Sequence, residues 1–145
     1  MKKLILITFV VFLGACQQSS IEAIIDIKSI VGKNQSEVEK ILGTAEKTEK
    51  LIVNDQSWDK VYYQYGEIEI VYINDKADWV TIYMASAYEM TRSAIQLLDL
   101  PYKRPTYFNP DSAIRWDSYE GIKEISFFPD LEGKIFFIYI KAFTK

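Results

Sequence analysis

The sequence predicts an α+β fold in which two tandem, degenerate repeats, each a helix followed by a three-stranded meander, form one antiparallel sheet with the helices on one face. Three observations lead to this prediction. Apolar residues change from a helical spacing to a spacing of two along the chain. The same succession of signals occurs twice, at about 27–84 and at about 88–143. A shift of 55 or 56 residues superimposes similar residues, such as Leu42 on Leu98 and Gly66 on Gly121, as expected of an internal duplication.

Residues 1–15 have the layout of a secretory signal peptide. Two lysines precede an apolar run from Leu4 to Leu13, which is interrupted only by Thr8. Two small residues, the second of them Ala15, then precede Cys16, and this pattern resembles the lipobox of bacterial lipoproteins. The resemblance implies cleavage between Ala15 and Cys16 and a diacylglyceryl thioether on Cys16.

Three other interpretations of this segment are weaker. Leu4 to Ala15 is 12 residues, whereas a helix needs about 20 to cross the hydrocarbon core. Cys16 is the only cysteine, so it cannot form an intramolecular disulfide. A buried thiol would require the polar stretch 17–20 to be buried with it. We therefore expect residues 16–23 to be the lipidated cysteine and its tether, and residues 24–145 to form a single α+β domain.

The charge of the chain restricts its partners. Without residues 1–15 it has 15 basic and 20 acidic residues, a formal charge of −5, and the two signs are interleaved. A nucleic-acid-binding protein needs a basic patch, so we expect no nucleic-acid partner. The acidic balance also disfavours electrostatic adhesion to anionic lipid. We expect the membrane to be held through the acyl chains on Cys16.

The first half of the domain opens with two helical signals. A short helix is expected within 24–31, where Asp26 can cap the first turn. Asn34 and Glu37 form the pattern of a capping box at the start of a predicted helix over 35–42. The apolar face of that helix is formed by Val38, Ile41 and Leu42.

After a polar linker at 44–57 the apolar spacing changes to two. The pattern predicts a meander of three strands, at 58–65, 67–73 and 79–84, with turns at Gly66 and at 74–78.

The second half follows the same order. Thr91 is expected to cap a helix that ends before Pro101, and a linker continues to Asp111. Three strands are then predicted, at 114–119, 122–128 and 134–143. The last strand is apolar on both faces, so we expect it at the centre of the sheet.

The side-chain inventory excludes most catalytic sites. The chain has no histidine, which rules out histidine-based triads and zinc sites of the His-Glu-x-x-His kind. Its cysteine is assigned to the lipid, and no glycine-rich phosphate loop occurs. A carboxylate pair such as Glu67 with Glu69 remains, but two acids on one strand face are more typical of a solvated edge. We expect a non-enzymatic protein without a cofactor or a metal.

Aromatic residues are the more informative set. Trp58, Trp79 and Trp116 lie at or near predicted strands, and aromatics on a sheet form protein interfaces, carbohydrate platforms or a core. We expect core packing for most of them. The expected partner-binding residues, on an open face of the sheet, are Tyr62, Thr81, Arg115 and Asp117.

The segment 32–43, with its glycine, polar cap, Glu-Val pair and Leu-Gly ending, resembles the SmpA/OmlA (BamE-like) lipoproteins and the related beta-lactamase-inhibitor-like fold. The resemblance covers 27–84 best and implies non-catalytic protein binding. Two classes stay open: an accessory of outer-membrane assembly or integrity, and an inhibitor or immunity-type lipoprotein that blocks an enzyme or toxin in the periplasm. A glutamine directly after the lipid cysteine, here Gln17, resembles the sequence preference for sorting to the outer membrane, where the protein would face the periplasm. In a host with one membrane, the anchor would lie in the cell membrane.

Overall fold

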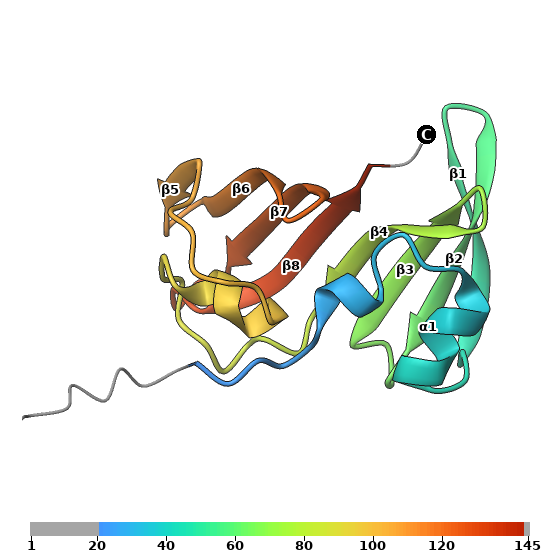
Figure 1. Cartoon of the computed structure of the whole chain (residues 1–145), viewed down its shortest axis with the longest axis horizontal. Coiled ribbons are helices and arrows are strands. Elements are labelled where there is room, and N and C mark those ends of the chain that lie inside the picture. The colour runs from blue at the N-terminus through green and yellow to red at the C-terminus, as the bar shows by residue number, and fades with distance from the viewer. Residues whose placement is uncertain (1–20, 144–145) are drawn as a thin grey trace, which may run out of the picture.

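The computed structural model describes residues 21–143, in which eight strands form one antiparallel sheet (Figure 1). The strand order is β1-β2-β3-β4-β8-β7-β6-β5. The signal peptide at 1–15, Cys16 and most of the tether lie outside the described residues. In chain order the strands are β1 Lys47–Val53, β2 Gln56–Tyr63, β3 Ile68–Ile73, β4 Lys76–Ile82, β5 Tyr107–Asn109, β6 Ala113–Tyr119, β7 Ile122–Pro129 and β8 Ile135–Ala142.

The helical content of the described chain is small: one α-helix, α1 (Gln35–Leu42), and two 3-10 helices, η1 (Ile27–Ser29) and η2 (Ala94–Leu98). The capping box predicted for α1 is confirmed, since the Asn34 side chain accepts from the backbone N–H of Glu37 at 2.9 Å and Glu37 accepts from that of Asn34 at 3.0 Å. The cap predicted at Asp26 is also present, although the element it begins is a single 3-10 turn.

The predicted pair of helix-plus-three-stranded-meander repeats is wrong. The sheet has eight strands instead of six, and the second expected helix is the 3-10 turn η2. Thr91 does not cap it, because the Thr91 hydroxyl pairs with the Ser93 hydroxyl at 3.1 Å, and no side chain among residues 21–143 caps its start. With a single α-helix, the described residues do not form two equivalent helix-and-meander units.

Two strands were missed because they lie at the edges of the sheet. Residues 47–53 and 107–109 were expected in linkers, yet they form β1 and β5, each paired on one side only. Edge strands are exposed and can be rich in charge, so they lack the alternating apolar pattern of half-buried strands. The sequence feature that could have indicated β1 is the hairpin turn that follows it. Asn54 and Asp55 both have positive φ, at 51° and 61°, which is typical of the two-residue turn that joins β1 to β2.

The hydrophobic core lies between one face of the sheet and the helical elements. Ile27, Val38 and Leu97, one from each helical element, belong to the same buried cluster as the strand residues Ile70, Val80 and Ile140. Strand β8 pairs with β4 on one side and β7 on the other, so its predicted central position is confirmed.

Candidate binding face

The register of the sheet brings the four predicted partner-binding residues to one face. Tyr62 lies opposite Glu69, which lies opposite Thr81 on the next strand, and this row of opposed residues continues across β8 and β7 to Arg115 on β6. Directly opposed residues of antiparallel strands point to the same face. Asp117 is two residues beyond Arg115 in the same strand and shares that face. We call this surface the open face; its central row is Tyr62, Glu69, Thr81, Tyr139, Ser126 and Arg115.

The open face is opposite to the core. None of the six residues of its central row belongs to the hydrophobic cluster that α1, η1 and η2 join. Most of them are half-buried by their neighbours in the sheet, and Ser126 is buried. The four predicted residues are thus placed on one face, while their role in binding stays a prediction.

A β-bulge in β4 places a buried carboxylate behind this face. Val71 opposes Trp79 and Tyr72 opposes Ala77, so Asp78 is the extra residue between them. Its side chain is fully buried and forms an ion pair with Lys141 of β8, whose side chain is 19% exposed. The other oxygen, Asp78 Oδ1, has no hydrogen-bond partner in the described part of the chain. Asp78 was not identified as a site residue from the sequence, because 74–78 was assigned to a turn. A charged residue between two residues of apolar character, Ala77 and Trp79, could have indicated a buried charge in a strand.

Two tryptophans pack together on the open face, and one of them, Trp79, lies beside this ion pair. Trp58 and Trp79 meet edge to face, with ring centroids 5.8 Å apart and an interplanar angle of 65°. Lys141 Nζ lies 5.7 Å from the centroid of the Trp79 ring. Trp116 is different, since it is fully buried in the core against Phe127. The expectation of core packing therefore holds for Trp116, whereas Trp58 and Trp79 are half-buried.

On the β1–β3 side of the open face, the charged side chains are held in place by contacts with neighbouring side chains. Lys60 forms an ion pair with Glu69 and lies 5.0 Å from the Tyr62 ring centroid. Tyr62 in turn donates its hydroxyl hydrogen bond to Glu49 at 2.7 Å. Burial lowers the pKa of Lys60, but hydrogen bonds to Glu69 and Tyr62 outweigh it, so the pKa is raised overall and Lys60 stays charged.

At the β6–β7 side, Arg115 Nε donates to Ser126 Oγ at 3.1 Å and lies 3.4 Å from Glu124 Oε1. Asp117 accepts a hydrogen bond of 2.7 Å from the hydroxyl of Thr106. Arg115 and Asp117 are therefore oriented by contacts within the protein. Such preordered polar groups lose little conformational entropy when a partner binds.

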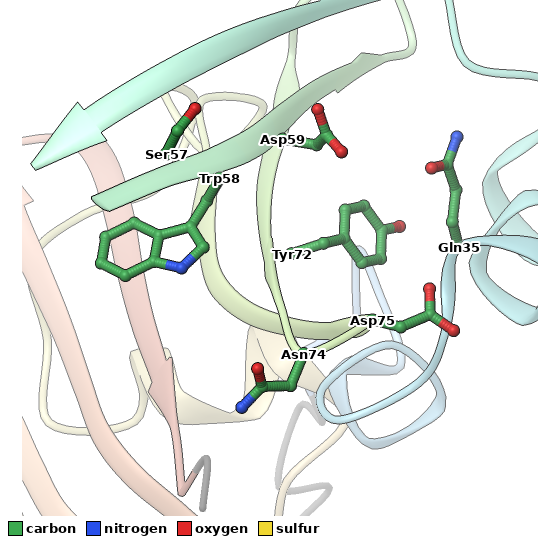
Figure 2. Close-up of a pocket in the computed structure, with 7 residues that line it drawn as sticks. All are labelled: Gln35, Ser57, Trp58, Asp59, Tyr72, Asn74 and Asp75. Atoms are coloured by element: carbon green, nitrogen blue, oxygen red, sulfur yellow. The ribbon is translucent and has the colours of Figure 1, made fainter. Parts of the chain in front are cut away.

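A polar pocket of about 290 Å³ opens where α1 meets β2 and the β3–β4 turn (Figure 2). The Tyr72 ring points towards Gln35, and the carboxylates of Asp59 and Asp75 lie to either side of it (Figure 2). Asp59 is paired with Lys50 at 2.6 Å. The remaining lining residues are Ser57, Trp58 and Asn74. Acidic and amide oxygens beside two rings could accept a small polar or cationic group. Sequence reasoning missed this pocket because part of it was assigned to the 44–57 linker.

An aromatic cluster extends the open face at the start of β8. Phe137 stacks on Phe128 at a centroid distance of 4.7 Å and contacts Tyr83 at 6.2 Å. Phe128 opposes Phe137 and Pro129 opposes Ile135, so Phe136 is the extra residue of a bulge. Its ring is 56% exposed and packs edge to face on Phe137. This cluster was not among the predicted site residues.

Within residues 21–143, no group of three or more acidic, cysteine or histidine side chains is arranged to hold a metal. The described helices include none that is long and apolar enough to cross a membrane. Comparison of the chain with protein-family models, with curated proteins and with solved structures gave no match.

Proposed function

We propose that this chain is a lipid-anchored, non-catalytic lipoprotein of the bacterial cell envelope that binds another protein through its open face. The lipobox-like pattern ending at Cys16 supports the anchor. The open face supports the binding role: the helical elements pack on the opposite side of the sheet, and two half-buried tryptophans stand beside oriented ion pairs. Aromatic residues beside charged groups that are held in place are typical of protein interfaces.

The proposed role is that of an accessory in outer-membrane assembly or integrity. Its support is the resemblance of the capped helix α1 to the SmpA/OmlA lipoproteins, together with Gln17 after the lipid cysteine. The protein would face the periplasm from the outer membrane, or stand on the cell membrane of a host that has only one. The partner would be a resident envelope protein.

The anchor is tested by Cys16→Ser. The wild type should fractionate with membranes and carry acyl mass on its N-terminal peptide, whereas the variant should carry none and leave the membrane fraction. A variant that stays membrane-bound, or a wild type without acyl mass, contradicts the anchor.

The binding face is tested by capture from detergent-solubilised envelopes with two matched variants. Thr81→Arg places a large cation in the centre of the open face, and Thr48→Arg places the same group on β1 opposite Val61, on the other face. Wild type and Thr48→Arg should capture the same envelope protein, and Thr81→Arg should lose it while keeping the wild-type melting temperature. Equal capture by both variants contradicts the role of the open face. A soluble hydrolase or toxin as the captured protein would replace the accessory role by the inhibitor or immunity role.

A further inference from the structure

The β7–β8 connection holds a leucine away from the protein. Asp130 Oδ1 accepts from the backbone N–H of Glu132 at 2.8 Å and from that of Lys134 at 2.9 Å, and Asp130 N–H donates to the Lys134 carbonyl at 2.8 Å. These bonds fix the turn, and the Leu131 side chain at its tip is fully exposed, at 107%. A single exposed leucine is ordinary. Here, however, the exposed Phe136 stands beside it.

Leu131, Phe136 and Pro129 line one open hollow of about 390 Å³, together with Asp111 and Asp130. We call the three apolar residues the apolar tip. Phe136 is exposed because the bulge in β8 turns it out of the core, while its neighbour Ile135 stays buried. Two large apolar side chains are thus presented to solvent by a fixed turn and a fixed bulge.

The apolar tip lies at the end of the molecule where the described chain begins. The segment 88–98 connects the two places: Met90 N–H donates to the Gly133 carbonyl at 3.3 Å, and Ile24 N–H donates to the Leu97 carbonyl at 2.9 Å. In Figure 1 the first described residues, in blue, and the start of β8 lie at the same end, and β1 lies at the other end.

The tether between Cys16 and the domain is short, so it limits which part of the domain can reach the membrane. Ile21 is five residues after Cys16, so the linking chain spans at most about 18 Å when fully extended. A domain of this size has a radius of gyration of about 14 Å and is roughly 35 Å across. When Cys16 is anchored in a bilayer, only the end of the domain near Ile21 can reach the lipid.

We propose that the apolar tip rests in the headgroup layer of the bilayer that holds the Cys16 anchor, with Leu131 and Phe136 in contact with zwitterionic lipid. The inference rests on the lipid anchor of the proposed function. Apolar side chains at the headgroup boundary gain by leaving water. Zwitterionic lipid is favoured over anionic lipid because two carboxylates, Asp111 and Asp130, line the hollow. The contact would orient the domain on the membrane.

The test uses the full-length, lipidated protein in phosphatidylcholine vesicles, with an environment-sensitive nitrobenzoxadiazole label on L131C. Because the Cys16 thiol is acylated, only the introduced cysteine reacts. I52C is the matched control, since Ile52 is also an exposed aliphatic residue, at 71%, on β1 at the opposite end of the sheet. The label at 131 should shift to the blue and be quenched by doxyl lipid, and the label at 52 should do neither. Added anionic phosphatidylglycerol should weaken the quenching at 131.

The experiment distinguishes failure of the apolar-tip contact from failure of the lipid anchor. If the protein floats with the vesicles and carries acyl mass, but the label at 131 is as water-exposed as that at 52, the anchor stands and the contact of the apolar tip is wrong. If the protein lacks acyl mass and does not float, the anchor itself fails and the contact falls with it. Quenching at 131 that grows with anionic lipid would overturn the preference for zwitterionic lipid.

Discussion

Lys141 on β8 forms an ion pair with Asp78, a fully buried residue that lies 63 positions earlier in the chain on β4. The pair spans the one place where β4 and β8 meet, opposite the side of the sheet that α1 covers. It therefore joins the β1–β4 half of the sheet to the β5–β8 half and fixes the charge beside Trp79.

Lys141→Met should destabilise the protein strongly, because it leaves the Asp78 carboxylate buried without its cation. Breaking a buried pair from one side costs about 3–5 kcal/mol of the free energy of unfolding. The double variant Asp78→Asn, Lys141→Met should recover part of this loss, since no uncompensated charge remains. Urea denaturation of the wild type, the single variants Lys141→Met and Asp78→Asn, and the double variant gives the coupling energy. Additive losses would show that the pair does not act as a unit.

The capping box of α1 should contribute measurably to stability. Asn34→Ala removes the acceptor for the Glu37 N–H and should lower the free energy of unfolding by about 1 kcal/mol. Val38→Ala should lower it by about 2 kcal/mol, because Val38 is the fully buried side chain of the helix. Ser36→Ala, at an exposed position in the first turn of the same helix, serves as a control for the change to alanine. Equal losses for all three variants would contradict the packing of the helix.

Alkaline pH should unfold the protein through its buried tyrosines. The Tyr63 and Tyr72 hydroxyls are 3.0 Å apart, and burial raises the pKa of both above the ordinary 10.0. In the unfolded chain they ionise near pH 10.0, while in the folded chain they stay neutral. Their contribution to stability is therefore complete below pH 10 and is lost progressively as the pH rises above it.

The free energy of unfolding, measured in urea at a series of pH values, should fall above pH 10. Tyr72→Phe should be less stable at neutral pH by about 1 kcal/mol, through the lost hydrogen bond, but should lose less above pH 10. Tyr65→Phe, which changes a side chain that is 97% exposed, is the matched control. A Tyr72→Phe curve parallel to that of the wild type would contradict the role assigned to this pair.

The parts of the fold that could be predicted from the sequence are those with strong local signals. The Asn34 and Glu37 cap determines where α1 begins, and the two-sided apolar pattern of β8 gives its central place. The edge strand β1 could not be found in the same way, because its burial depends only on its pairing with β2. The helix expected after Thr91 is a 3-10 turn whose apolar residues are all buried, so their spacing reflects packing on the sheet and not an α-helical period.

The candidate face was predictable only in part. Alternation along single strands placed Tyr62, Thr81 and Arg115 on one face, and the register agrees with that placement. Asp78 and Phe136 were not predictable in this way, because each is the extra residue of a bulge and a bulge reverses the alternation. The two residues that alternation misplaces are thus a buried charge and an exposed aromatic ring.

A fragment that ends at Met84 should not fold cooperatively, because it lacks the neighbour of β4. In the whole chain β4 pairs with β8, with Val80 opposite Ile140 and Ile82 opposite Ile138, and all four side chains are fully buried. The fragment 21–84 would expose this edge, the partners of the core cluster and the Asp78 carboxylate without Lys141. We expect it to bind a hydrophobic dye, to aggregate and to lose a sharp thermal transition, whereas 21–145 should melt in one step. Circular dichroism melting of both proteins decides the question. A soluble 21–84 fragment with a cooperative transition would show that β1–β4 and their helices form a unit that does not need β8.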